Sequence, residues 1–252
     1  MYSETGKNSV EVCFSPLSWP LFDSENAVVV ITDIFRASTA MVAGIHNGVR
    51  SIIPVSEISE SEDYKARGFI VAGERDGKKL DCAHFGNSPL NFMEPYLRGQ
   101  TICMNTTNGT QAIKAVAHGN NDVVIGAFLN ISAVARFAIN KQKPVVIFCA
   151  GWKNRFSLED TLFAGALVEQ LIMAGRGDFY TKCDSAIASA DLWLLAKGNL
   201  TEYLEKASHR HRLRRMGLDD IIDFSLTTDF TTVVPILQGI ELVNASLTGS
   251  TG

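Results

Sequence analysis

The stretch CAGWKNRFSLEDTLFAG, residues 149–165, predicts a strand end, a loop and a helix start, and this order of elements decides the fold. The apolar residues 144–148 precede it, so the strand ends at about Cys149. The loop carries Gly, Lys, Asn and Arg, and a serine begins a helix whose first turn holds Glu159 and Asp160. A cationic loop between a strand and two carboxylates suits an anion that is bound together with a metal ion.

Unbroken apolar runs alternate with helical patterns along the chain. Such runs are typical of strands that are covered on both faces, as in parallel sheets. The alternation predicts an α/β protein with three layers, α/β/α, around a largely parallel or mixed sheet. The predicted strands are 27–31, 51–55, 69–72, 101–104, 122–125 and 145–149, and the helices between them are 38–47, 59–67, 111–117 and 131–140.

The last third of the chain is predicted to be rich in helix. The predicted helices there are 157–174, 182–196 and 201–216. We expect residues 1–252 to form a single catalytic unit. The pattern also allows two lobes, about 1–140 and 141–252, with the site between them.

Composition excludes several classes of protein. The 252 residues carry a net charge of -4, whereas nucleic-acid binders are usually basic, so no nucleic-acid partner is expected. The basic run 206–215 is interpreted as one solvated helix face, from which His209 or Arg212 can still reach an anionic ligand. The five cysteines include no C-x-x-C pair, which disfavours structural zinc and a disulfide framework.

No targeting or membrane signal is recognised in the sequence. The first fifteen residues lack a basic segment followed by an apolar one, and no apolar run approaches the roughly 20 residues that a membrane span needs. We therefore expect a cytoplasmic protein without a membrane partner. A homo-oligomer is compatible with the sequence, and a dimer is favoured.

The segment after the first predicted strand is the first candidate site. Asp33 follows the strand directly, and ligands of open α/β sheets bind beyond the carboxyl ends of the strands. Arg36, Ser38 and Thr39 come next, at the start of a helix, where they can hold a phosphate or a sulfonate. The alternative is that Asp33 or Ser38 only caps the helix.

Two further strand ends carry polar residues. Glu74 and Arg75 follow the strand 69–72, where they either bind a ligand or form a surface ion pair of little energy. The loop 105–110, NTTNGT, follows the strand 101–104 and offers hydroxyl and amide groups with a glycine that permits close backbone approach. Such a loop suits an oxyanion, although it also suits a helix cap.

Four acids follow predicted strands or begin a predicted helix, namely Asp33, Glu74, Glu159 and Asp160. Hard carboxylate oxygens are the ligands that Mg²⁺ prefers, so these four are the predicted metal ligands. For Glu159 and Asp160 the alternative is a capping box, because acids in the first helical turn are favoured by the helix dipole.

Seven motifs in one order resemble the 2-phosphosulfolactate phosphatase family. The motifs are DIFRAST (33–39), GER (73–75), GNSP (86–89), TTNGT (106–110), GAFLN (126–130), AG (150–151) and RFSLED (155–160). The match extends from about residue 28 to residue 165 and more loosely through 208–209 and 229–235. Any one motif is weak evidence, and seven in register are strong.

The resemblance implies a Mg²⁺-dependent phosphatase that converts 2-phospho-3-sulfolactate to 3-sulfolactate and phosphate, on the route to coenzyme M. The catalytic residues that we assign are Asp33, Arg36, Glu159 and Asp160. The assigned substrate-binding residues are Arg36, Ser38, Thr39, Arg75, Asn87, Ser88, Thr106, Thr107, Asn108, Gly109, Thr110, Asn130, Gly151, Arg155 and His209.

Two stretches depart from the family pattern. Residues 82–85, CAHF, lack the acid that typically precedes GNSP, and the loop 152–154, WKN, has larger or more basic residues than the family pattern. Both departures leave phosphomonoester hydrolysis better supported than the exact substrate.

The mechanism has several alternatives at the level of sequence. Water can attack directly, or Asp33 can form an aspartyl-phosphate, although the Asp-x-Asp pattern is missing because Phe35 stands third. Cys149 is disfavoured as a nucleophile because Arg155 lies six residues later, which does not match Cys-x₅-Arg. The leaving alkoxide can be protonated by His209, His84 or Lys153.

A second class of function stays open, namely a non-catalytic protein that binds or senses an anion on the same scaffold. The acid cluster argues against it, because anion binding gains nothing from buried carboxylates.

Overall fold

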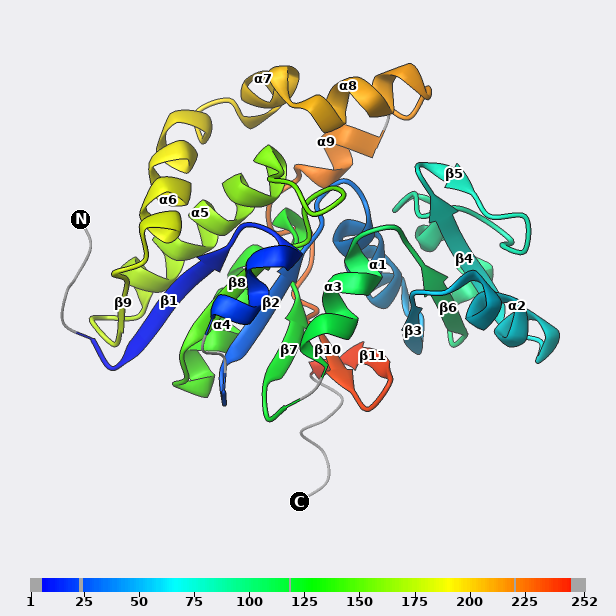
Figure 1. The fold of residues 1–252 in the computed structure, drawn as a ribbon, viewed down its shortest axis with the longest axis horizontal. Coiled ribbons are helices and arrows are strands. Elements are labelled where there is room, and N and C mark those ends of the chain that lie inside the picture. Colours follow the sequence, from blue (N-terminus) through cyan, green and yellow to red (C-terminus); the bar gives the residue numbers. More distant parts are fainter. Residues whose placement is uncertain (1–5, 23–24, 118, 220, 246–252) are drawn as a thin grey trace.

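The computed structural model describes residues 6–22, 25–117, 119–219 and 221–245, and a mixed sheet forms its centre (Figure 1). Within these residues the sheet has eleven strands in the order β5-β4-β6-β3-β11-β10-β7-β2-β8-β1-β9. The strands are β1 (Asn8–Cys13), β2 (Val28–Thr32), β3 (Ser51–Val55), β4 (Ile70–Arg75), β5 (Lys78–Lys79), β6 (Thr101–Asn105), β7 (Asp122–Ile125), β8 (Val145–Cys149), β9 (Phe179–Tyr180), β10 (Pro235–Gln238) and β11 (Glu241–Asn244).

The sheet consists of two parallel blocks joined by an antiparallel hairpin. One block holds β4, β6 and β3, and the other holds β7, β2, β8, β1 and β9. The hairpin of β10 and β11 lies between them and pairs antiparallel with β7 and β3. The predicted parallel or mixed sheet is therefore confirmed.

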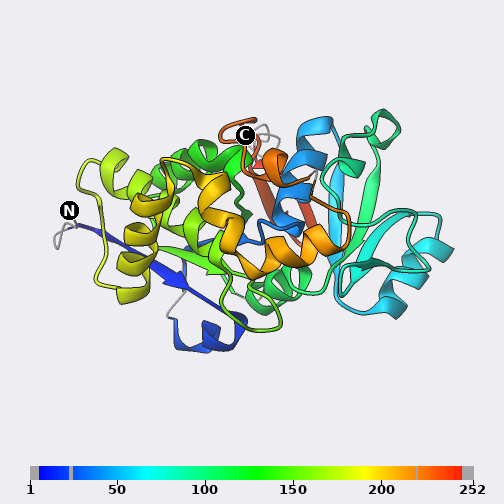
Figure 2. The ribbon, with the colours of Figure 1, turned by 90° about the horizontal axis from the view of Figure 1, so that it is seen from above.

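Helices cover both faces of the sheet, as the two views at right angles show (Figures 1 and 2). The α-helices are α1 (Ala37–Asn47), α2 (Ile58–Ala66), α3 (Gly109–Val116), α4 (Ile131–Lys141), α5 (Leu158–Ala174), α6 (Asp184–Ala196), α7 (Leu200–Tyr203), α8 (Ser208–Arg215) and α9 (Ile221–Ser225). The short 3-10 helices are Pro16–Leu21, Asn91–Met93, Pro95–Leu97, Phe128–Asn130 and Leu204–Lys206. Among the described residues no helix is long and apolar enough to cross a membrane.

All six predicted strands are present, because each unbroken apolar run is buried between the two helix layers. In β2, β6 and β8 every residue is buried. The helix-rich C-terminal third is confirmed as well. The division into two lobes stays a prediction.

Five of the described strands were not predicted, namely β1, β5, β9, β10 and β11; β5 has only two residues, both lysines. β1 alternates buried with half-buried residues over its first four positions, so it lacks an unbroken apolar run. β9 has only two residues, and β10 and β11 have four each, which is too short for a clear pattern.

The single helix predicted over 201–216 is wrong. The segment forms α7, a 3-10 turn and α8, because Ala207 has extended backbone angles, φ -68° and ψ 131°. The break buries Leu204, Ala207 and Leu213, each at most 2% exposed. As a result α8 turns toward the ends of the strands, where α7, α8 and α9 lie together (Figure 1).

The closest helix packing is between α5 and α6, and it depends on Gly165. A Cβ built on Gly165 would meet the carbonyl group of Ser189 and would lie 2.9 Å from the Cβ of Trp193. Overpacking of this kind costs about 1–3 kcal/mol, and the better helix propensity of alanine returns about 1 kcal/mol at most. We therefore expect Gly165→Ala to lower the free energy of unfolding by about 2 kcal/mol in urea titrations.

Gly198 provides the matched control, since a Cβ built there would have no neighbour within 4 Å. Gly198→Ala should change the free energy of unfolding by less than about 0.5 kcal/mol. If Gly165→Ala were as stable as the control variant, the close packing of α5 on α6 would be refuted.

Candidate active site

Three contiguous cavities lie beneath α8. The central pocket is small, about 50 Å³, and is lined both by acids and by residues of α8. Its lining residues are Asp33, Phe35, Arg36, Glu74, Asp76, Gly77, Asn87, Thr107, Asn108, Trp152, His209, Arg212, Leu213 and Met216. The α8 pocket, about 230 Å³, shares Trp152, His209 and Arg212 with it and adds Arg155, Phe156, Ser157, Glu159 and Ser208. The outer groove, about 580 Å³, continues on the side of Arg36 and Asn87 past Lys78, Lys79 and Ser88.

Asp33 lies at the base of the central pocket, directly after β2. Its backbone N–H donates to Ser38 Oγ at 2.8 Å, and the N–H of Ser38 donates to the Asp33 carbonyl at 2.9 Å, so the turn into α1 is fixed. Burial raises the pKa of Asp33 from its ordinary value of 3.8 to about 6, and the negative charges of Glu74 and Glu159 add to the rise against the opposing effect of His209. Burial therefore outweighs the nearby positive charge in setting the pKa of this carboxyl group.

Arg36 precedes α1 and brings positive charge to the same pocket. The residue is only 6% exposed, and within the described residues its guanidinium makes no ion pair within 4.0 Å. Burial lowers its pKa, whereas the charges of Glu74 and Asp33 raise it. A buried guanidinium without an acid in contact is suited to an anionic ligand.

Glu74 and Arg75 lie on opposite faces of β4. The Glu74 carboxylate lines the pocket and accepts hydrogen bonds from the N–H of Thr107 at 2.8 Å and of Gly77 at 2.7 Å. Arg75 donates to the Ser56 carbonyl at 3.0 Å and to Asn105 Oδ1 at 2.9 Å, and it lines none of the three cavities. This alternation follows from the strand geometry and places only Glu74 at the site.

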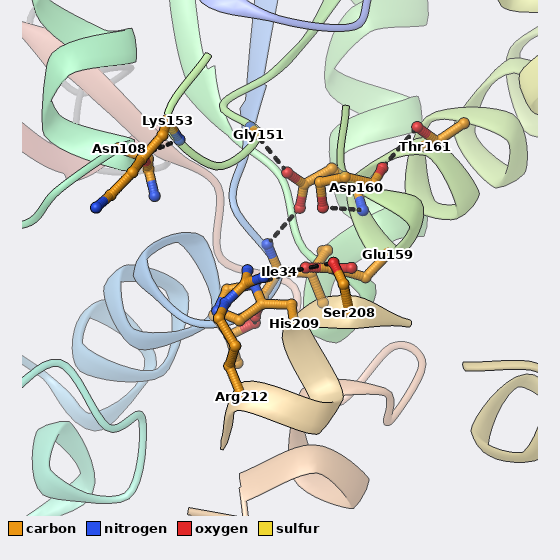
Figure 3. Close-up of polar contacts among 12 residues, drawn as sticks. Ile34, Asn108, Gly151, Lys153, Glu159, Asp160, Thr161, Ser208, His209 and Arg212 are labelled. Atoms are coloured by element: carbon orange, nitrogen blue, oxygen red, sulfur yellow. Dashed lines mark hydrogen bonds and ion pairs between the residues drawn. The ribbon is translucent and has the colours of Figure 1, made fainter. Parts of the chain in front are cut away.

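Asp160 joins the ends of β2 and β8 and faces none of the three cavities. Its two carboxylate oxygens accept the N–H of Ile34 at 2.9 Å and that of Gly151 at 3.1 Å (Figure 3). Burial raises its pKa well above the ordinary value, and the charges of Glu159 and Asp33 raise it further. Ser157 caps α5 by accepting the Asp160 N–H, as the capping alternative predicts.

Glu159 forms a pair with His209 of α8. Glu159 Oε1 lies 2.7 Å from His209 Nδ1, and the carboxylate is 2% exposed (Figure 3). Burial raises the pKa of Glu159, but the hydrogen bond and the charge of His209 outweigh burial and lower it overall. The carboxylate fixes the imidazole ring, whose other nitrogen is left for a ligand in the central pocket.

The loop 106–110 is partly a cap and partly a wall of the pocket. Thr106 and Thr110 bond to each other, since the Thr110 N–H donates to Thr106 Oγ1 at 3.2 Å and Thr110 Oγ1 donates to the Thr106 carbonyl at 2.9 Å. Thr107 and Asn108 line the central pocket. Gly109 is required there, because an added Cβ would lie 2.6 Å from the Cβ of Ala37 and 3.2 Å from Oδ2 of Asp33.

Four other predicted binding residues bond to the protein itself. Ser38 accepts the Asp33 N–H, Thr39 Oγ1 donates to the Ile34 carbonyl at 2.8 Å, and Asn130 Nδ2 donates to the carbonyls of Ile125 and Val233. Gly151 donates its N–H to Asp160. These residues shape the loops. The remaining predicted residues line cavities: Asn87 the central pocket, Ser88 the outer groove, Arg155 the α8 pocket and His209 both inner cavities.

The sequence named His209 and Arg212 as residues that can reach an anion, but it did not predict that α8 forms a wall of the site. His209, Arg212, Leu213 and Met216 line the central pocket from this side, and their spacing of three, one and three is that of one helix face. The density of basic residues hid this periodicity. Trp152 was noticed only as a departure from the family pattern, yet it lies under the Arg212 guanidinium, 4.1 Å from ring centre to Cζ.

The four predicted metal ligands do not form one ligand group. Among the described residues no group of three or more His, Cys, Asp or Glu side chains is arranged to hold a metal ion. Asp33 and Glu74 share the central pocket with Asn87, whose Oδ1 is buried and has no hydrogen-bond partner. Two carboxylates and an amide oxygen suit Mg²⁺, which takes few protein ligands and keeps several waters.

An α/β scaffold with buried acids and unpaired guanidiniums in one pocket defines a site for an anionic ligand. Residues 13–239 match the family described as 2-phosphosulpholactate phosphatase, so the chain belongs to this family and the resemblance is confirmed.

Curated relatives carry the same description. The protein of Caldanaerobacter subterraneus, "Probable 2-phosphosulfolactate phosphatase", is 37% identical over 86% of this chain and 90% of its own length. Relatives with that name from Thermotoga maritima and Symbiobacterium thermophilum are 34% and 33% identical, over 93% and 89% of this chain and 98% and 97% of their own lengths.

Proposed function

We propose that this chain is a Mg²⁺-dependent phosphatase that hydrolyses 2-phospho-3-sulfolactate to 3-sulfolactate and phosphate. The observation that carries the proposal is the central pocket, where buried acids and an unpaired arginine face a histidine that is hydrogen-bonded to a carboxylate. Membership of the family supplies the substrate.

The phosphate group is held between Arg36 and the loop that begins α3. Arg36 contributes a guanidinium that has no acid in contact, and Thr107 and Asn108 line the opposite wall. A planar guanidinium forms paired hydrogen bonds to two phosphate oxygens. The bound phosphate therefore lies next to Asp33, which is close to Gly109.

Asp33 and Glu74, with Asn87 as an amide ligand, would hold Mg²⁺ in this pocket. When bound, Mg²⁺ offsets the negative charge of the phosphate and activates water for attack. Asp160 keeps a different role, because its oxygens fix the loops after β2 and β8 through the N–H groups of Ile34 and Gly151.

His209 is the residue that we assign to proton transfer. Its Nδ1 donates to Glu159, so Nε2 is the atom that delivers a proton to the leaving alkoxide oxygen of the substrate. The other two candidates are less suitable. The Nδ1 of His84 accepts the N–H of Val71 at 3.0 Å, and Lys153 Nζ is paired with Asp76 at 2.8 Å.

A cysteine nucleophile has no support. Cys149 is fully buried in β8, and burial raises the pKa of its thiol well above the ordinary value, so little thiolate forms. The choice that remains is between water and Asp33 as the attacking group. A short incubation with labelled substrate followed by acid quench separates them, because only attack by Asp33 leaves a phosphorylated enzyme.

Activity should require a divalent cation. We expect EDTA to lower turnover of 2-phospho-3-sulfolactate by at least about 100-fold and Mg²⁺ to restore it, because the acid-lined pocket repels a phosphate dianion in the absence of metal. The measurement is phosphate release with and without Mg²⁺ over a panel of small phosphomonoesters. Silence across the whole panel, together with calorimetric binding of the same anions, would replace the enzyme with an anion-binding protein.

A further inference from the structure

We propose that Arg212, held against Trp152, is the residue that selects substrates with a sulfonate beside the phosphate. This inference rests on the proposed phosphatase activity and concerns the α8 pocket, which adjoins the central pocket. The sulfonate would bind to the Arg212 guanidinium in the α8 pocket.

Arg212 stands where the two cavities meet. It lines both the central pocket and the α8 pocket, together with Trp152 and His209. Arg36, where the phosphate is proposed to bind, lines the central pocket and the outer groove but not the α8 pocket. 2-Phospho-3-sulfolactate carries a phosphate, a sulfonate and a carboxylate, and in this arrangement its phosphate meets Arg36 and its sulfonate meets Arg212.

The charge of Arg212 is available for a ligand, unlike that of its neighbours on α8. Arg210 and Arg214 are paired with Glu205 at 2.6 and 2.9 Å. Arg212 makes no ion pair within 4.0 Å in the described part of the chain, and its hydrogen bond to Ser208 Oγ is long, 3.4 Å. An unpaired guanidinium beside a cavity attracts an anion.

Trp152 fixes the position of the guanidinium. The Arg212 Cζ lies 4.1 Å from the centre of the indole ring, and such stacking contributes about 0.5–2 kcal/mol. Trp152 belongs to a two-residue hairpin turn, in which Lys153 and Asn154 have positive φ of 49° and 61°. The turn is closed by hydrogen bonds between Trp152 and Arg155, of 3.0 and 3.1 Å.

The same turn brings a second guanidinium to the cavity. Arg155 lines the α8 pocket together with Arg212, and this pocket, about 230 Å³, is larger than the central one, about 50 Å³. The larger volume suits the bulkier sulfonate rather than the planar carboxylate. The turn also explains the departure of the loop 152–154 from the family pattern, because Trp152 supports Arg212.

The test compares two substrates that differ only in the sulfonate, 2-phospho-3-sulfolactate and 2-phospholactate. Arg212→Ala should lower kcat/KM by about 100-fold for the sulfonated substrate and by less than about 3-fold for 2-phospholactate. Trp152→Phe keeps an aromatic face and should retain most of the selectivity, which is the ratio of kcat/KM for the two substrates. Trp152→Leu should lower this ratio by about 10-fold.

Arg215→Ala is the matched control, because Arg215 is exposed on the same helix and lines none of the three cavities. Arg215→Ala should change kcat/KM by no more than about 2-fold for either substrate. The inference would be overturned if Arg212→Ala lowered kcat/KM equally for both substrates. It would also be overturned if Arg215→Ala lost as much selectivity as Arg212→Ala. If the wild-type protein hydrolysed neither substrate, the proposed function itself would fail.

Discussion

Replacing Asp33 with asparagine should lower kcat by at least about 1,000-fold while the protein stays folded. Asp33 is buried at the base of the central pocket, beside Arg36 and Glu74. An amide cannot serve as a nucleophile and is a weaker metal ligand, so the loss follows from either mechanism. The measurement is phosphate release at saturating Mg²⁺.

The same variant should be more stable than the wild type when EDTA is present. Burial raises the pKa of Asp33 from 3.8 to about 6, so the fold disfavours the charged form. This loss of stability is absent below the unfolded pKa of 3.8. It grows as the pH rises from 3.8 to the folded pKa of about 6, and it is complete above about 6. At pH 8 the neutral amide avoids it, and we expect the free energy of unfolding to rise by up to about 3 kcal/mol.

Asp122→Asn is the matched control for this prediction. Asp122 begins β7 and is paired with Lys141 at 2.9 Å and Lys143 at 2.7 Å, well outside the three cavities. It should keep full activity and lose about 1 kcal/mol of stability, the opposite sign to Asp33→Asn. Retention of more than a tenth of wild-type activity by Asp33→Asn would refute the role of Asp33.

The fold was predictable where burial on both faces produced unbroken apolar runs. β2, β6 and β8 have no exposed residue, and each was predicted with its end within one residue. The hairpin of β10 and β11 was missed, because four-residue strands carry too few positions for a pattern. That hairpin joins the two parallel blocks, so the strand order was beyond sequence analysis.

The sequence predicted that the site lies at the ends of strands. It predicted less well which side chains face the pocket. Asp33 and Thr107 follow strands, Glu74 lies near the end of β4, and all three line the central pocket. Arg75 at the end of β4 and Asp160 in the first turn of α5 were also predicted, but they bond to other protein groups instead of lining the pocket. The face of a strand and the course of a neighbouring loop decide where such a side chain points. Sequence alone does not contain that information.

The contacts of the α8 residues were also beyond prediction from the sequence. His209 was predicted to reach an anion, and the partner that positions it, Glu159, was assigned to catalysis and to metal binding. Their separation of 50 residues leaves no local signal for the 2.7 Å hydrogen bond between them. Loss of His209 from this pair should therefore lower the rate strongly, to an extent that depends on the leaving group.

His209→Asn should lower kcat for 2-phospho-3-sulfolactate by about 100- to 1,000-fold, and for p-nitrophenyl phosphate by less than about 5-fold. An alkoxide needs a proton to leave, whereas the nitrophenolate leaves without one. Asparagine keeps a donor for Glu159, so α8 should stay in place. Glu159→Gln should show the same dependence on the leaving group with a smaller loss of about 10-fold, because the amide oxygen still accepts the Nδ1 proton but carries no charge.

His211→Asn serves as the control, since His211 is exposed on the same helix and lines none of the three cavities. It should leave both rates unchanged. A loss for His209→Asn that is equal on both substrates would assign His209 to binding of the phosphate, which the two substrates share. A loss confined to the alkyl ester requires proton transfer to the leaving oxygen, since only that step distinguishes the two leaving groups.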